Sequence, residues 1–204
     1  MAASAPAWSP TWPDPLAPAW STGRKVAFRF PCSYFVLYNF PFPLSALPFF
    51  DELLGGYRGA WHRVVPWVGQ HLLHMARPIT VFENGSGDTT YNYVQVLCFF
   101  VLAVAVTLAW TLLDRGRSNY SRAHQWLRVY LRYSLGLTMI AYGAIKVIKS
   151  QFPDPYLYRL LEPFGSASPM GLLWTFMGYS APYNTFAGAA EMSAGILLAL
   201  RRTS

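Results

Sequence analysis

The sequence predicts an all-α fold: a multi-pass helical membrane protein with about four transmembrane helices plus interfacial amphipathic helices. Of its 204 residues, 53% are apolar and only 12% are charged, about half the charge density of a soluble domain. The run 93–113 has no charged side chain and is long enough to cross a hydrocarbon core of about 30 Å. The net charge of +7 lies mainly beside the apolar runs, which is typical of a membrane orientation signal and does not indicate nucleic-acid binding.

The N-terminal segment, residues 1–22, is rich in Pro and Trp and lacks the basic start and unbroken apolar core of a signal peptide. We expect a disordered tail here. The first span is predicted at about 24–48, as a helix over 24–40 followed by a broken end. Prolines disfavour a helix interior but are tolerated in membrane helices, and this stretch contains Pro31, Pro41, Pro43 and Pro48.

Residues 51–76 place apolar side chains at helical spacing with basic residues between them, which predicts an amphipathic helix on the membrane surface, bent near Pro66. The polar segment 83–90 precedes the second span, predicted at about 92–113. The Gly-Ser-Gly sequence of this polar segment is not followed by the Lys-Ser/Thr of a phosphate-binding loop. A helix cap explains the same polar residues more simply, and the candidates are Asp88, Thr89 and Thr90.

The sequence divides into an N-terminal membrane region, 23–127, and a C-terminal region, 128–204. A basic loop predicted at 114–128 lies at the boundary between them. Two further spans are predicted at about 129–149 and 182–200. In the outer connection 150–181, the dipeptides Asp154-Pro155 and Ser168-Pro169 each resemble an N-cap followed by a first helical residue. The run 170–177 that follows Ser168-Pro169 is too short to span a bilayer, which indicates an interfacial or re-entrant helix.

The distribution of Lys and Arg predicts one topology. The basic residues at 24–25, 114–128 and 201–202 fall on the same side if the chain crosses the membrane four times. Because cytoplasmic segments carry such an excess, both termini of this chain are expected to be cytoplasmic, with 51–90 and 150–180 outside.

The third and fourth spans each carry an ionisable group among small residues on one face, and the third span also places Arg132 near its start on that face. The groups among the small residues are Lys146 and Glu191, and an ionisable group at membrane depth is normally paired inside the protein. Small residues on the same faces allow close helix packing; they are Gly136, Gly143, Gly188 and Gly195. We therefore predict a buried Lys146–Glu191 ion pair. The alternative is that Lys146 extends to the lipid headgroups and Glu191 is neutral.

Whether the pair serves as a ligand site, a proton site or only in helix assembly stays open at this stage, and no catalytic residue is assigned. His71 and His74 share a helical face at i,i+3, but no cysteine or H-E-x-x-H pattern accompanies them, so no metal site is expected. Cys32 and Cys98 lie in apolar segments far apart and are interpreted as small apolar side chains.

Two C-terminal segments resemble a known family. Residues 131–146, LRYSLGLTMIAYGAIK, are similar to the first helix of DoxX-like membrane proteins, with R-x-x-L-G followed by G-x-x-K. Residues 186–198, FAGAAEMSAGILL, resemble the second helix, with its Glu and following G-x-L-L. The resemblance covers about 128–202 and implies half of a four-helix core in a bacterial plasma (inner) membrane. The expected partners are therefore the lipid bilayer and either missing C-terminal helices, if the chain is truncated, or a partner membrane subunit.

The sequence supports three hypotheses about function. The first is an accessory or structural membrane protein of DoxX-like type without an assignable catalytic activity. The second is a quinone-coupled membrane oxidoreductase subunit. Quinone is the only cofactor suggested, and only by the resemblance; the spans contain no histidine for haem ligation. The third is a small-molecule carrier, against which the absence of a repeated pair of broken helices counts.

Overall fold

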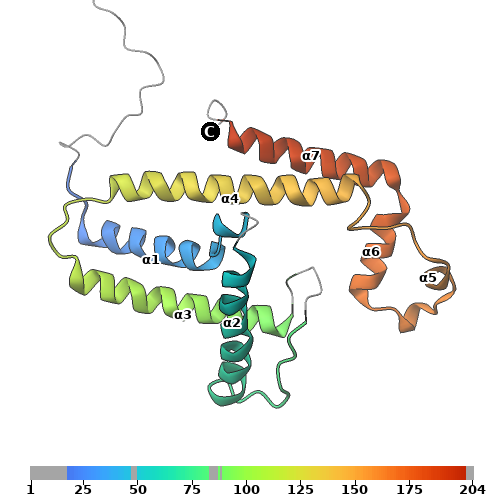
Figure 1. Cartoon of the computed structure of the whole chain (residues 1–204), viewed down its shortest axis with the longest axis horizontal. Coiled ribbons are helices and arrows are strands. Elements are labelled where there is room, and N and C mark those ends of the chain that lie inside the picture. Colours follow the sequence, from blue (N-terminus) through green and yellow to red (C-terminus); the bar gives the residue numbers. More distant parts are fainter. Residues whose placement is uncertain (1–17, 47–49, 83–86, 88, 201–204) are drawn as a thin grey trace, which may run out of the picture. The chain divides into compact units, whose positions relative to one another are not determined.

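The computed structural model describes residues 18–46, 50–82, 87 and 89–200. In this part of the chain the regular structure consists of seven α-helices and two short 3-10 helices, with no strand (Figure 1). The all-α fold class is therefore confirmed. The chain divides into two compact units, 1–128 and 129–204, one residue from the predicted boundary between its N-terminal and C-terminal regions. Helix α4 runs through this division.

The first unit contains three long helices and the beginning of a fourth: α1 (Thr22–Asn39), α2 (Asp51–His71), α3 (Thr90–Leu113) and the first two turns of α4 (Ser121–Val147), with a 3-10 helix, η1, at Leu44–Ala46. Helix α1 includes Pro31 and ends at Asn39, near the predicted break. Its C-cap Phe40 is extended, as expected for a residue before proline, where the α conformation is disfavoured. The rest of the predicted span is not a continuation of α1, and residues 47–49 lie outside the described residues.

Helix α3 is the best-defined predicted element. Thr89 is its N-cap, and the Thr89 hydroxyl accepts a hydrogen bond from the Asn92 amide nitrogen at 3.2 Å. The Thr89 amide in turn donates to Asn92 Oδ1 at 3.3 Å, completing a reciprocal cap of the kind that satisfies free N–H groups at a helix start. Among the described helices, α3 alone is long and apolar enough to cross a membrane by length and composition. The other three spans stay predictions.

Helices α1 and α3 lie side by side in antiparallel directions (Figure 1). Arg29, early in α1, bonds to Thr111 near the end of α3, whereas the Tyr38 ring near the end of α1 meets the Phe99 ring in the first half of α3 at 6.3 Å. The contacts therefore run in opposite order along the two helices.

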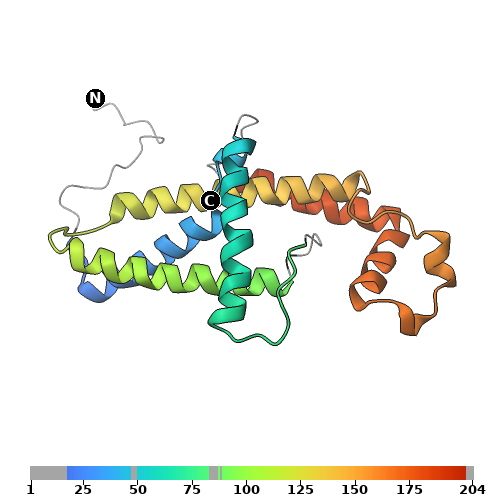
Figure 2. The same cartoon turned by 60° about the horizontal axis from the view of Figure 1, so that its bottom comes forward.

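Helix α2 packs across α3 (Figure 2). Fully buried Val65 of α2 meets Tyr91 and Val94 of α3 in an apolar cluster that also takes in Ile79. The helix ends at His71, five residues before the predicted end. The chain then turns back, because the Met75 amide donates to the Gly69 carbonyl at 3.0 Å, and this turn lets Ile79 reach the cluster.

The second unit contains the remainder of α4 and four short or medium elements: α5 (Leu157–Leu161), a 3-10 helix, η2 (Phe164–Ser166), α6 (Pro169–Tyr179) and α7 (Ala181–Ala199). The predicted start of α6 is confirmed, since Ser168 is the N-cap, its hydroxyl accepts from the Gly171 amide at 3.0 Å, and Pro169 is the first helical residue.

Two further predictions, one in each unit, are wrong. Asp154 does not cap a helix: α5 begins only at Leu157 with Tyr156 as its N-cap, and the Asp154 carboxylate pairs instead with the Lys149 ammonium. The basic segment predicted as a loop over 114–128 is helical from Ser121 onward. Basic residues mark a membrane boundary, but Arg is a good helix former, so the charge does not end the helix.

Helices α4 and α7 approach closely within the second unit, and glycines form the contact. A Cβ atom added at Gly143 would lie 2.5 Å from the Gly188 carbonyl oxygen, and one at Gly195 would lie 2.7 Å from the Gly136 carbonyl oxygen. Only glycine permits such a backbone approach, as in the small-residue interfaces of membrane helices.

Replacing Gly143 by Ala should lower the free energy of unfolding by about 1–3 kcal/mol, because the new methyl group would meet a backbone carbonyl that cannot rotate away. The matched control is Gly56→Ala in α2. A Cβ there meets nothing within 4 Å, so alanine should raise the unfolding free energy by about 0.5–1 kcal/mol. Denaturant unfolding of the detergent-solubilised protein, followed by circular dichroism, measures both changes. An undiminished stability in Gly143→Ala would contradict the close approach.

Candidate functional site

The predicted ionisable groups of the second unit, Lys146 and Glu191, are brought together by α4 and α7. Lys146 lies in the last turn of α4, and its Nζ donates directly to Oε1 of Glu191, in α7. The Lys146 side chain is 13% exposed and that of Glu191 is 35% exposed. The pair is therefore partly buried: the ammonium is mostly shielded from water, whereas the carboxylate keeps part of its surface exposed. The shielded ammonium needs this acceptor, because an isolated charge in an apolar environment costs several kcal/mol.

The glycine contact makes room for this pair. A Cβ atom at Gly188 would lie 3.0 Å from the Lys146 Cβ and 2.6 Å from the Gly143 carbonyl oxygen. The two helix backbones and the Lys146 stem therefore occupy the space that a larger residue at Gly188 would fill. All four predicted glycines take part in this helix contact, which positions the ammonium against the carboxylate.

Two acceptor oxygens on the same face of α7 remain buried without a hydrogen-bond partner. One is Oε2 of Glu191 and the other is Oδ1 of Asn184. Asn184 is fully buried, and its amide nitrogen donates to the Met177 carbonyl at 2.9 Å, which ties α7 to α6. Buried acceptors normally have a partner. The arrangement can therefore accept a hydrogen-bond donor or a proton in addition to holding the helices together.

The histidines are not placed as predicted. His71 is the last residue of α2, and His74 lies beyond the helix with a φ of 49°, so the expected shared helical face does not exist. The His71 ring instead stacks on Trp67 at 5.0 Å. In the described ranges no group of three or more His, Cys, Asp or Glu residues could hold a metal ion. Both cysteines, Cys32 and Cys98, are partly buried free thiols.

A second polar cluster, in the first unit, was not predicted from the sequence. It centres on Arg29 of α1, which is 2% exposed. Its guanidinium donates to the Tyr120 hydroxyl at 2.6 and 3.1 Å, to the Thr111 hydroxyl at 3.0 Å and to the Asp114 carbonyl at 2.7 Å. These bonds join the start of α1 to the end of α3 and to the connection that follows it.

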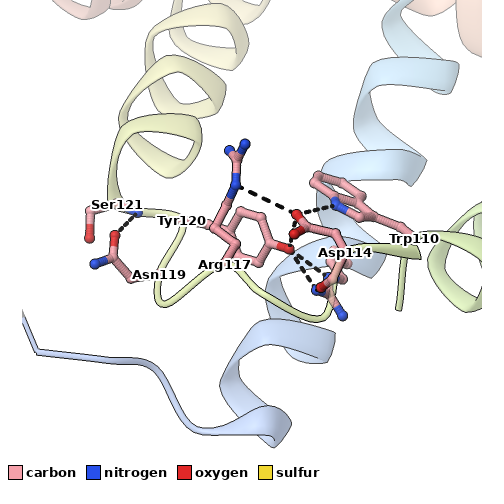
Figure 3. Close-up of polar contacts among 7 residues, drawn as sticks. Trp110, Asp114, Arg117, Asn119, Tyr120 and Ser121 are labelled. Atoms are coloured by element: carbon pink, nitrogen blue, oxygen red, sulfur yellow. Dashed lines mark hydrogen bonds and ion pairs between the residues drawn. The ribbon is translucent and has the colours of Figure 1, made fainter. Parts of the chain in front are cut away.

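The Tyr120 hydroxyl links the Arg29 guanidinium to the Asp114 carboxylate. It donates to Oδ2 of Asp114 at 2.7 Å, while the Trp110 indole N–H lies 3.3 Å and the Arg117 guanidinium 3.6 Å from the same oxygen (Figure 3). The hydrogen bond from Tyr120, followed by that from Trp110 and the nearby charge of Arg117, holds the pKa of Asp114 below its ordinary value. Asp114 is the C-cap of α3, just outside the apolar run.

Aromatic rings surround this polar cluster. Phe28 stacks on Tyr120 with ring centroids 5.5 Å apart, and Trp20 meets Phe28 edge-on at 5.6 Å. The Trp20 amide also donates to the Ser118 carbonyl at 2.9 Å. The predicted disordered tail over 1–22 therefore does not extend to its expected end, since Trp20 is packed and α1 begins at Thr22. Residues 1–17 lie outside the described residues.

One signal in the sequence could have identified this cluster. Arg29 is a single basic residue inside an otherwise apolar run, and such a residue in a candidate span normally has a partner within the protein. Two of its partners, Asp114 and Tyr120, lie in the connection between α3 and α4. The basic residues of that connection were interpreted only as an orientation signal. Comparisons of the chain with protein-family models, curated proteins and solved structures find no match.

The lowered pKa of Asp114 predicts a pH dependence of stability. The ionised carboxylate stabilises the fold fully above the ordinary value of 3.8, and this contribution is lost as the pH falls through the lower pKa of the folded state. Tyr120→Phe removes the main cause of the shift. The thermal midpoint of the variant should therefore lie below that of the wild type at pH 7, and the gap should narrow as the pH falls from about 5 to about 3.

The control for this measurement is Tyr93→Phe, because Tyr93 is 67% exposed on α3. Its thermal midpoint should follow that of the wild type at every pH. A Tyr120→Phe gap that stays constant or widens toward low pH would show that the Asp114 carboxylate does not depend on Tyr120.

Proposed function

We propose that this chain is a multi-pass integral membrane protein of DoxX-like type with an accessory or structural role, in which the Lys146–Glu191 pair joins two membrane helices. The observation that carries the proposal is the direct contact of these two charged groups between glycine-lined helix faces. A buried ion pair on small-residue faces is the arrangement by which membrane helices tolerate charge and pack closely.

Exposed apolar surface supports a membrane environment. The outer face of α3 leaves Val101, Leu108 and Leu112 at least 58% exposed, and in the second unit Phe176 and Phe186 are more than 70% exposed. Apolar surface of this extent is costly in water and marks a membrane or protein interaction site. Lipid acyl chains would cover it.

The arrangement of α1 and α3 supports the proposed orientation. The Arg29–Asp114 and Trp20–Ser118 hydrogen bonds hold the start of α1 beside the end of α3. Arg24 and Lys25, at the start of α1, therefore lie at the same end of the first unit as Arg115 and Arg117, which follow α3. A basic end of this kind is what the positive-inside rule expects of a chain whose first two spans form a hairpin. Arg58, Arg63 and Arg77, in the segment 51–90, reduce the bias without reversing it.

A ligand- or proton-binding role is the second candidate, and the buried unpaired Oε2 of Glu191 favours it. In this case the pair would serve a quinone-coupled oxidoreductase subunit or a small-molecule carrier, the two alternatives raised by the sequence. Proton relays and ligand counter-ions are common uses of ionisable residues at membrane depth.

Cysteine labelling tests the proposed topology. Cys32 and Cys98 are first replaced by Ala, and single cysteines are then introduced by Ser118→Cys, between α3 and α4, and by Ser166→Cys, in η2; both serines are exposed. In intact cells an impermeant maleimide should label the Ser166→Cys protein. The Ser118→Cys protein should react only after permeabilisation. The opposite pattern would reverse the orientation, and labelling of both or neither in intact cells would mean that α4 does not cross the membrane.

A double-mutant cycle tests the structural role of the pair. Lys146→Met and Glu191→Gln should each lower the unfolding free energy in detergent by about 1–3 kcal/mol, because each leaves one uncompensated, partly buried group. The double variant should recover part of the loss, since neither charge then remains. Strictly additive losses would show that the two side chains do not interact and would end the proposal for a shared site.

The same cycle separates the two candidate roles. If Glu191 binds a proton and donates a hydrogen bond, Glu191→Gln should be nearly silent and Lys146→Met should account for the whole effect. Structural pairing requires both single variants to lose stability.

A further inference from the structure

The connection from α4 to α6 carries apolar side chains that are left uncovered in the second unit. It contains α5 and η2 (Figure 1), and we term its residues 156–164 the α5 loop. No residue of α5 is buried. The three leucines of α5 are 66–76% exposed and the phenylalanine that begins η2 is 80% exposed; these residues are Leu157, Leu160, Leu161 and Phe164. An exposed apolar surface of this kind marks a contact with a membrane or a protein.

The charged side chains of the α5 loop are less exposed than its leucines. The Arg159 side chain is 28% exposed and that of Glu162 is 24% exposed. Nη1 of Arg159 donates to Oε2 of Glu162 at 2.7 Å, so the two charges neutralise each other within the loop. A Cβ atom added at Gly171, in the first turn of α6, would lie 3.2 Å from Nη2 of Arg159. The guanidinium therefore lies against α6 and not toward the surroundings.

Helical spacing explains why the two kinds of side chain separate. With 3.6 residues per turn, the leucines at 160 and 161 fall within about 60° of Leu157 around the axis of α5, whereas Arg159 falls about 200° away. One face of α5 is thus apolar and turned outward, and the opposite face carries the paired charge and is turned toward α6. A helix at the surface of a protein in water has the reverse arrangement, with its apolar face inward. The medium that covers α5 is therefore apolar.

The residues beside the leucines favour lipid as that medium. The stacked rings of Tyr156 and Tyr158 are 59% and 60% exposed, and tyrosine favours the boundary between lipid and water. Asp154, just before the loop, pairs with Lys149 and is 80% exposed, as expected on the water side of such a boundary.

We propose that the α5 loop is a membrane anchor, which inserts the leucines of α5 and Phe164 among the acyl chains of the adjacent lipid leaflet. This inference rests on the proposed function, because only helices that cross the membrane on either side of the loop hold it at the bilayer surface. The inserted face contains no charged side chain, since Arg159 and Glu162 pair on the side of α6. The loop does not cross the bilayer, because α5 has only five residues.

Fluorescence from a single labelled cysteine tests the anchor. In the variant without Cys32 and Cys98, Leu161→Cys is labelled with the fluorophore NBD, and the full chain is reconstituted in phosphatidylcholine vesicles. The emission maximum should lie at a shorter wavelength than that of NBD on Ser118→Cys, an exposed position between α3 and α4. A nitroxide near the headgroup end of the acyl chains should quench the Leu161→Cys label about twofold more than a nitroxide at the chain terminus, because an interfacial helix inserts only about 5–10 Å.

A label on Leu157→Cys, on the same face of α5, should give the same result and keeps the test available if Leu161→Cys does not fold. An emission maximum equal to that of Ser118→Cys at either position would overturn the anchor. A shorter wavelength without quenching by either nitroxide would also overturn it, because protein would then cover the leucines. Flotation of the vesicles reports membrane insertion separately. Water-like emission from protein that floats overturns the anchor alone, whereas protein that does not float overturns the proposed function as well.

Paired substitutions test whether apolar side chains hold the loop in the lipid. In protein labelled at Leu157→Cys, the combination of Leu160→Asn and Leu161→Asn should shift the emission to longer wavelength and remove the quenching by the nitroxide near the headgroup. The matched control combines Leu160→Ile and Leu161→Ile, which keep the apolar surface, and should leave both signals unchanged. Circular dichroism of each variant verifies its helix content. Equal signals from the asparagine and isoleucine variants would overturn the anchor.

Discussion

A cation held inside a helical protein must find its acceptors within the protein, and each unit of this chain is organised around one such cation. In the first unit, buried Arg29 makes four hydrogen bonds to the end of α3 and the connection after it. In the second, Lys146 reaches Glu191 across the α4–α7 contact. Removing either set of acceptors would leave a charge that costs several kcal/mol, so the helix pairs are fixed in register by their charged groups as well as by apolar packing.

The surroundings of the two cations differ because their acceptors differ. Arg29 bonds mainly to neutral oxygens at helix ends, so aromatic rings such as Phe28 and Tyr120 can close around it. Lys146 instead needs a carboxylate from the middle of another helix, and α7 can deliver Glu191 only if the two backbones come close. The Gly143–Gly188 approach supplies that closeness. A glycine stripe and an ionisable residue on the same helix face are thus one feature of the fold.

Local capping signals predicted two helix starts and failed at a third, and helical periodicity predicted one distant contact but not another. The starts of α3 and α6 follow from the capping chemistry of Thr89 and Ser168, which acts over three residues. Asp154-Pro155 offers the same local signal, yet Lys149 takes the carboxylate, and no helix begins there. The approach of Lys146 to Glu191 was accessible from helical periodicity, because both residues lie on the small-residue faces of consecutive helices. In the Arg29 cluster, the single basic residue in an apolar run indicates that a partner is needed, but periodicity could not identify Tyr120, which lies in the connection between α3 and α4.

The two charged clusters differ in whether their buried acceptor oxygens all have hydrogen-bond donors. At Arg29 the hydroxyl of Tyr120 both accepts from the guanidinium and donates to Asp114, so the central groups of that cluster are occupied. On α7 the carboxylate of Glu191 and the carboxamide of Asn184 each keep one buried oxygen without a donor. An unsatisfied buried acceptor costs about 1–3 kcal/mol. A donor that reaches this face, whether water, a partner helix or a ligand, would recover that free energy, whereas none is available to recover at Arg29. Both clusters hold helices together, but only the α7 face has buried acceptors to which an additional hydrogen-bond donor could bind with a gain in free energy.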